Sequence, residues 1–130
     1  MKKNPIYPDP LPPKQAAEMN AIVLAFVGDA VMTLSVRAEL AATHSEKAHA
    51  LHKRAASEIN AHAQSLVADR ILPLLNEAET AVYMRARNGK TAPPKNADPA
   101  EYKKATGLEA VVGYLYLSGQ NERMSELFES

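Results

Sequence analysis

The sequence contains no cysteine and no tryptophan, and only two of its 130 residues are phenylalanine. Without cysteine the chain has no disulfide framework, no thiol nucleophile and no cysteine ligand for zinc. It also lacks any run of about eighteen apolar residues free of charge, which predicts that no segment spans a membrane. The opening residues, MKKNPIYPDPLPPK, have no apolar core of the kind that secretory signals carry. These absences predict a cytoplasmic protein.

The overall charge does not indicate what the chain binds. Fifteen basic residues match fifteen acidic ones, so net charge gives no evidence for a nucleic-acid partner. The distribution is uneven, however, because residues 84–104 contain six Lys or Arg against one Asp and one Glu. This segment is either a basic contact surface or a solvated loop, and composition alone does not separate the two.

Helical periodicity dominates the chain after its first residues. Residues 1–13 are rich in proline and predict an extended lead-in. From residue 14 to residue 130, apolar residues recur three and four positions apart and no stretch alternates like a strand, which predicts an all-α domain. The expected helices cover 15–26, 29–42 (with Gly28 as a break or a close-packing point), 45–69 starting at Ser45, 76–87, 99–118 and 121–129.

Two of these helices have clear capping signals. Asn76 is followed by Glu79 three residues later, which is a capping box. Asp98 precedes Pro99, a pair typical of the N-cap and the first helical position. Between these helices, NGKTAPPKNA is rich in Gly, Pro and Asn and predicts a loop.

Two apolar segments each contain a single charged residue. Asp29 is the only charged residue in AIVLAFVGDAVMTLSV, which covers residues 21–36 and ends at Val36. Glu109 is the only charged residue in ATGLEAVVGYLYLS, which covers residues 105–118. A buried unpaired carboxylate is costly, so each must be neutralised, hydrogen-bonded or matched by a cation. Asp29 follows a glycine and could cap a helix, whereas Glu109 lies well inside one. If the two helices pack together, a hard divalent cation, Mg²⁺ or Mn²⁺, would satisfy both carboxylates.

The same segments resemble a known family. LAFVGDAV, followed far downstream by ATGLEAVVGYLYL, is similar to the nuclease domain of the ribonuclease III family, where a Gly-Asp pair and a late Glu-Ala pair supply Mg²⁺ ligands. LHKRAASEINAHAQ and RARNGKTAPPKNADPAEYKKATGLEA resemble the middle helix and basic loop of its Mini-ribonuclease III subfamily, which lacks a double-stranded-RNA-binding domain. The similarity extends over residues 18–128. It implies an all-α, ribonuclease III-type domain that forms a homodimer through the segment containing Asp29.

The activity that this resemblance implies is Mg²⁺-dependent cleavage of double-stranded RNA, with Mn²⁺ as a substitute and with 5′-phosphate and 3′-hydroxyl ends. Asp29 and Glu109 would be the catalytic metal ligands. Longer relatives have additional acidic positions, so this site would hold its metal with fewer carboxylates and more water. Those positions are occupied here by Ile22, Ala25 and Thr106, and a middle-helix glutamate falls on or near His62.

Contact with duplex RNA is made mainly to phosphates and 2′-hydroxyls, which requires suitably spaced Lys and Arg. Three groups of basic residues are candidates, with surface solvation as the alternative for each. The first surrounds the RNGKTAPPK loop, the second lies on the middle helix and the third precedes Glu109. The predicted RNA-binding residues are Arg85, Arg87, Lys90 and Lys95, then Lys53 and Arg54, then Lys103 and Lys104.

The expected task within the subfamily is maturation of the precursor of 23S large-subunit ribosomal RNA. Whether a ribosomal protein assists is left open by the sequence, as are the RNA stem cut and the number of metal ions. The alternative is a catalytically silent dimeric RNA-binding or ribosome-assembly protein on the same fold, which the reduced set of carboxylates suggests.

Overall fold

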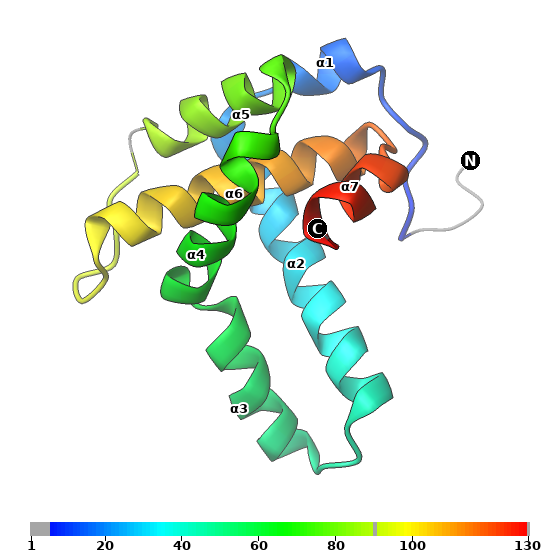
Figure 1. Ribbon diagram of the computed structural model, residues 1–130, viewed down its shortest axis with the longest axis vertical. Coiled ribbons are helices and arrows are strands. Elements are labelled where there is room, and N and C mark those ends of the chain that lie inside the picture. The colour runs from blue at the N-terminus through cyan, green and yellow to red at the C-terminus, as the bar shows by residue number, and fades with distance from the viewer. Residues whose placement is uncertain (1–5, 90, 130) are drawn as a thin grey trace.

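The computed structural model describes residues 6–89 and 91–129, and every regular element within these two ranges is a helix (Figure 1). The predicted all-α fold is therefore confirmed. The elements are α1 (Pro13–Ala17), α2 (Ala21–Thr43), α3 (Ala48–Ile59), α4 (Ala61–Ile71), the 3-10 turn η1 (Leu72–Leu74), α5 (Glu77–Arg87), α6 (Pro99–Leu117) and α7 (Asn121–Phe128).

Helix α6 forms the centre of the domain. It contacts α1, α2, α4, α5 and α7, and it crosses the middle of the view in Figure 1. Every residue from Ala105 to Leu115 is buried except Glu109, which is partly exposed. A helix that is apolar on all sides has to be covered on all sides, which explains its central place. Glu109 is thus the one side chain in this run that reaches the surface.

Helix α2 passes through Gly28 without interruption, so the prediction of separate helices on either side of Gly28 is wrong. The start of α2 is capped instead by Asn20, whose side chain accepts the backbone N–H groups of Ile22 and Val23. Asp29 consequently lies inside a continuous helix and caps nothing. Of the two roles expected for Gly28, close packing is the one the structure supports.

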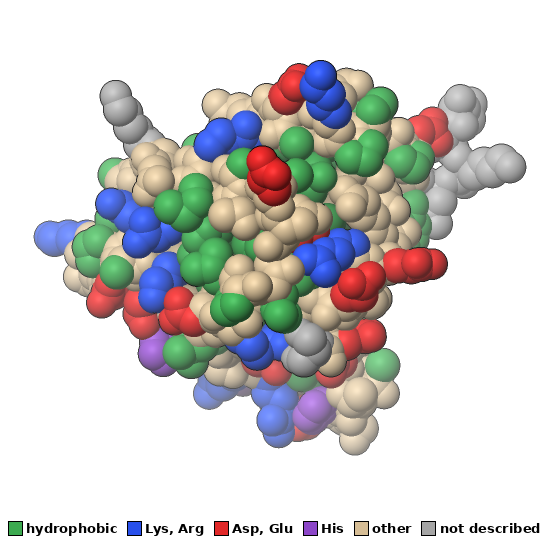
Figure 2. Space-filling view, turned by 45° about the horizontal axis from the view of Figure 1, so that its top comes forward, with side chains coloured by type: hydrophobic (Ala, Val, Ile, Leu, Met, Phe, Trp, Pro, Cys, Tyr) green, Lys and Arg blue, Asp and Glu red, His purple; other side chains and the backbone are tan. Residues whose placement is uncertain are grey.

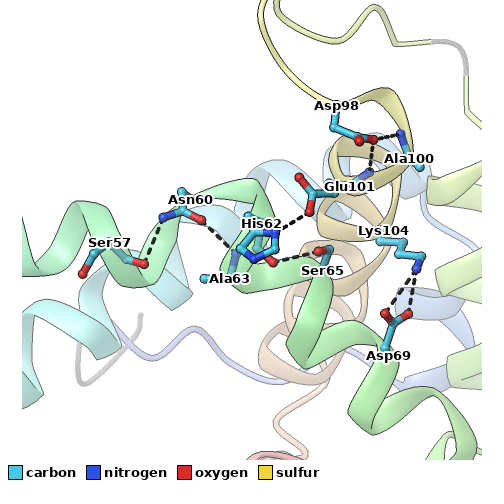
Figure 3. Close-up of polar contacts among 10 residues, drawn as sticks. All are labelled: Ser57, Asn60, His62, Ala63, Ser65, Asp69, Asp98, Ala100, Glu101 and Lys104. Carbon is cyan, nitrogen blue, oxygen red and sulfur yellow. Dashed lines mark hydrogen bonds and ion pairs between the residues drawn. The ribbon is translucent and has the colours of Figure 1, made fainter.

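The predicted helix 45–69 is divided at Asn60 into α3 and α4, and it starts after Lys47 rather than at Ser45. Asn60 has extended backbone, and its side chain accepts the N–H of Ala63 while donating to carbonyl oxygens of the preceding turn (Figure 3). Asparagine favours such caps because its side chain replaces backbone hydrogen bonds. The break lets α3 run beside the second half of α2 as an arm that projects from the core (Figure 1).

Both predicted capping signals are present. Asn76 and Glu79 form the capping box of α5, with both hydrogen bonds at 2.9 Å. Asp98 accepts two backbone N–H groups at the start of α6, and Pro99 occupies its first position. Helix α6 ends where Gly119 adopts a φ of 67°, a left-handed conformation that glycine adopts without steric cost.

Two contacts close the domain around α6. The backbone N–H of Leu11 donates to the carbonyl oxygen of Leu117 at 2.9 Å, which holds the proline-rich segment against the end of α6. On α7, the Arg123 guanidinium binds both carboxylate oxygens of the fully buried Glu79, at 2.9 and 2.8 Å. Burial alone would raise the pKa of Glu79, but the hydrogen bonds from Arg123 and from the Asn76 backbone outweigh it and hold that pKa below its usual range. The ion pair therefore fastens α7 to α5.

Candidate active site

The crossing of α2 and α6 brings two helix backbones into direct contact. A Cβ added at Gly28 would lie 1.7 Å from the carbonyl oxygen of Glu109, and one added at Gly113 would lie 1.9 Å from that of Leu24. Because real contacts are never this short, only glycine fits at either position. Asp29 follows Gly28, so the contact holds Asp29 beside the turn of α6 that contains Glu109.

The Asp29 and Glu109 carboxyl groups face each other at this crossing. The pKa of Glu109 is raised to about 8, and burial of its carboxyl group is the largest cause. A hydrogen bond with Asp29 and the negative charge of Asp29 raise this pKa further. Asp29 itself is exposed. The structure thus brings together the two isolated carboxylates that the sequence predicted would meet.

The donor set of this pair fits a hard divalent cation. Mg²⁺ binds to one or two carboxylates and keeps several of its waters. No ion pair among the described residues involves Asp29 or Glu109, so both carboxylates are available to a cation. Binding would displace the proton that Glu109 holds. Within residues 6–89 and 91–129 no group of three or more Asp, Glu or His could hold a metal, so water has to complete the coordination shell.

The residues at the other acidic positions of longer relatives supply no further carboxylate. The Thr106 hydroxyl is buried, one turn before Glu109, and donates to the carbonyl oxygen of Tyr102 at 2.9 Å. His62 projects from α4 and is hydrogen-bonded to Glu101 near the start of α6 (Figure 3). Ala25 is part of the core, and the end of the Ile22 side chain lies against Gly89.

The raised pKa of Glu109 predicts how stability depends on pH when no metal is bound. The folded chain keeps a proton on Glu109 that the unfolded chain releases above its ordinary pKa of 4.5. The contribution of protonated Glu109 to the free energy of unfolding is therefore fully present below pH 4.5 and is lost as the pH rises to about 8. Solvent screening weakens the effect for this partly exposed group, so we expect a loss of about 2 kcal/mol. Urea unfolding in EDTA at pH 5 and pH 8 should show this fall in the wild type and not in Glu109→Gln; equal pH dependence in both would contradict it.

Three of the predicted RNA-binding residues are already engaged within the chain. Arg85 donates to the carbonyl oxygens of Ala17 and Met19, at 2.6 and 3.1 Å, and so links α5 to the α1–α2 turn. Arg54 pairs with Glu46 on the arm, and Lys104 pairs with Asp69 between α6 and α4 (Figure 3). These contacts do not exclude phosphate binding, but they assign each cation a structural role that its sequence position did not indicate.

The remaining candidates are less constrained. The side chains of Lys53, Lys95 and Lys103 are exposed and have no hydrogen-bonding partner among the described residues, and the Arg87 guanidinium donates a hydrogen bond to the Asn88 side chain, at 3.3 Å. Lys90 lies outside the described residues. On the face shown in Figure 2, Lys and Arg side chains are interspersed with Asp and Glu rather than gathered into one patch. All eight assignments therefore remain predictions.

Comparison with known proteins shows which family this chain belongs to. The model of the Ribonuclease III domain matches residues 22–120. The chain belongs to the ribonuclease III family. It is 44% identical over 117 residues to the Mini-ribonuclease 3 of Desulfitobacterium hafniense (strain Y51), covering 90% of this chain and 74% of that protein. It is 43% identical over 110 residues to that of Symbiobacterium thermophilum, covering 84% of this chain and 85% of that protein.

A solved structure supports the same fold. The crystal structure of a protein from Fusobacterium nucleatum matches with a TM-score of 0.78 and 32% identity, covering 86% of this chain and 90% of that one. The similarity to Mini-ribonuclease III that the sequence indicated is thereby confirmed. The family match includes both Asp29 and Glu109, and it supports a nuclease of the ribonuclease III family.

Proposed function

We propose that this chain is an endoribonuclease that cleaves double-stranded RNA with Mg²⁺ held by Asp29 and Glu109, Mn²⁺ serving as a substitute. The supporting observation is the carboxylate pair at the glycine crossing of α2 and α6. The products carry 5′-phosphate and 3′-hydroxyl ends. The substrate is the precursor of 23S ribosomal RNA in the cytoplasm, which the similarity to Mini-ribonuclease III favours.

The chemistry divides between the ion and the chain. When bound, Mg²⁺ lowers the pKa of a coordinated water and offsets the negative charge that develops on the phosphate. Asp29 and Glu109 orient the site by presenting oxygen ligands from two helices whose backbones touch. Glu109 lies within an otherwise buried run of α6, which limits the water around its carboxylate. Because Glu109 must lose its proton to bind a cation, more metal is needed as pH falls below about 8.

The direct test is incubation of the purified chain with a long RNA duplex, with Mg²⁺ and with EDTA. Cleavage only with the metal supports the proposal, and products that accept a new 5′-phosphate only after phosphatase treatment have the expected ends. The reduced carboxylate set favours one rival, a silent RNA-binding or ribosome-assembly dimer. Binding of the duplex without cleavage at any Mg²⁺ or Mn²⁺ concentration would support that rival and overturn the nuclease proposal.

The exposed face of α2 supports a homodimer. Phe26 and Leu34 are 79% and 54% exposed, and together with Ile6 and Tyr7 of the proline-rich segment they line an apolar groove along α2. The groove has protruding rings beside small residues on one surface, so it can receive the same surface of a second copy, as a two-fold contact requires. Asp29 also lines this groove, which would place both active sites close to the dimer interface.

Helix α2 also passes the length and composition test for a membrane span, with a mean hydropathy of 1.7 in a window that is 17% buried. Helices in the cores of other proteins are equally long and apolar, so this composition does not by itself indicate a membrane span. Asp29 in its middle faces Glu109, and a carboxylate pair at that depth is costly in lipid. The expectation that nothing spans a membrane stays a prediction.

Phe26→Ala is expected to dissociate the dimer. In a two-fold contact the substitution removes one ring from each copy, which costs about 3 kcal/mol of association free energy in total. This raises the dimer dissociation constant by at least about a hundredfold. Leu66→Ala is the matched control, because Leu66 is 58% exposed on α4 and lies outside the groove. Sedimentation velocity should show dimers for the wild type and the control and monomers for Phe26→Ala. A monomeric wild type, or one recovered with lipid vesicles, would refute this assignment of the apolar groove.

A further inference from the structure

A second groove runs between the two helices of the arm. It lies where the second half of α2 faces α3, and it ends near the break between α3 and α4. Toward the tip of the arm it continues between Leu40 and Leu51, where its walls are apolar. We call it the arm groove, and its lining residues toward α4 are Thr33, Arg37, His52, Ala55, Ile59 and Asn60.

The arm groove contains a cation that the protein does not neutralise. Arg37, His52 and Thr33 have no hydrogen-bonding or ion-pairing partner among the described residues. Arg54 on the same arm differs, because Glu46 binds its guanidinium at 2.6 Å. Asn60 differs too, because its side chain accepts the N–H of Ala63 on α4 and donates to carbonyl oxygens in the last turn of α3. The groove therefore offers a free guanidinium, an imidazole and a hydroxyl, and no carboxylate among its lining residues opposes them.

The position of this groove relative to the active site follows from helix geometry. Asp29, Thr33 and Arg37 are spaced four residues apart on one continuous helix, so they follow one another along the same side of α2. Arg37 lies about 12 Å along the axis from Asp29, at about 1.5 Å per residue. A strand whose phosphate is held at Asp29 therefore passes the arm groove if it follows α2.

We infer that the arm groove binds a backbone phosphate of the RNA strand that is cleaved at Asp29 and Glu109. Arg37 provides the bidentate donors that a phosphate accepts, with the Thr33 hydroxyl and the His52 ring as additional donors. This inference rests on the proposed function. It adds a residue of α2 to the predicted RNA contacts, and it gives a reason why this cation is left unpaired.

The test is binding of a fluorescent RNA duplex in EDTA, measured by anisotropy over a series of salt concentrations. Arg37→Gln is expected to bind about tenfold more weakly than the wild type, with a salt slope lower by about one. Arg37→Lys keeps the charge but not the paired donors and should fall between them. Lys14→Gln is the control, because it removes one exposed charge from α1, outside the groove, and should match the wild type within twofold.

Two failures are distinguishable. If the wild type cleaves duplex RNA with Mg²⁺ while Arg37→Gln binds with the wild-type affinity and salt slope, the inference is wrong and the proposed function stands. If the wild type neither binds nor cleaves the duplex, both are wrong. Arg37 is exposed, so a thermal melt of the variant should match that of the wild type.

His52→Gln provides a second measurement of RNA binding. We expect it to weaken binding of the duplex by a smaller factor than Arg37→Gln.

Discussion

Glu109→Gln is expected to lower the rate of duplex RNA cleavage by about a thousandfold while the chain stays folded. The substitution keeps the size of the side chain but removes the negative charge that a divalent cation requires. Glu109 is the only partly exposed side chain in the buried run of α6, so no neighbouring carboxylate on that helix can replace it. Single-turnover cleavage at saturating Mg²⁺ measures the effect.

Two further variants make this result specific. Glu101→Gln is the control on the same helix, because Glu101 is bonded to His62 and lies outside the carboxylate pair; its rate should stay within about twofold of wild type. Asp29→Asn should lose as much activity as Glu109→Gln, and the double variant should lose no more, because the two ligands act as a unit. Equal losses in Glu101→Gln and Glu109→Gln, or wild-type cleavage by Glu109→Gln, would remove the carboxylate pair from the mechanism.

Gly113→Ala is expected to destabilise the fold by at least about 3 kcal/mol, because it overpacks a contact between backbones. Its Cβ would lie 1.9 Å from the carbonyl oxygen of Leu24, and backbone cannot move aside as a side chain does. Separating α2 from α6 would also separate Asp29 from Glu109, so activity should fall in whatever fraction remains folded. A thermal melt should show a fall of about 10 °C for a chain of this size.

The control for this prediction is Gly89→Ala. The nearest atom to its added Cβ is the end of the flexible Ile22 side chain, at 3.0 Å, which can rotate away. Gly89 has no positive φ, so alanine is not strained there, and we expect a change in melting temperature of less than about 2 °C. If Gly113→Ala has the same melting temperature as Gly89→Ala, the backbones of α2 and α6 do not touch as described. The placement of Asp29 beside Glu109 is then wrong.

Local signals predicted the fold well where they were self-contained. The Asn76–Glu79 capping box and the Asp98–Pro99 start depend on side chains within one turn, so sequence alone was sufficient. The helix boundaries at Gly28 and Asn60 were predicted wrongly for opposite reasons. Glycine usually weakens a helix, but here α6 needs the space that Gly28 leaves. Asn60 lies inside the stretch 45–69 that was predicted as one helix, yet its side chain caps a new helix there.

For the candidate site, the two carboxylates could be predicted because each is the single charge in an apolar segment. The partners of the basic residues could not. Arg85 reaches carbonyl groups more than sixty residues earlier in the chain, and Arg123 meets Glu79 from 44 residues away. Nothing in local sequence distinguishes such cations from solvated ones.

The central claim, that Asp29 and Glu109 together hold a divalent cation, is tested most directly by titrating Mn²⁺ into the chain and following free Mn²⁺ by electron paramagnetic resonance at pH 8. We expect the wild type to bind the ion, Asp29→Asn and Glu109→Gln each to lose that binding, and Glu101→Gln to keep it. Undiminished Mn²⁺ binding by either Asp29→Asn or Glu109→Gln would contradict the claim.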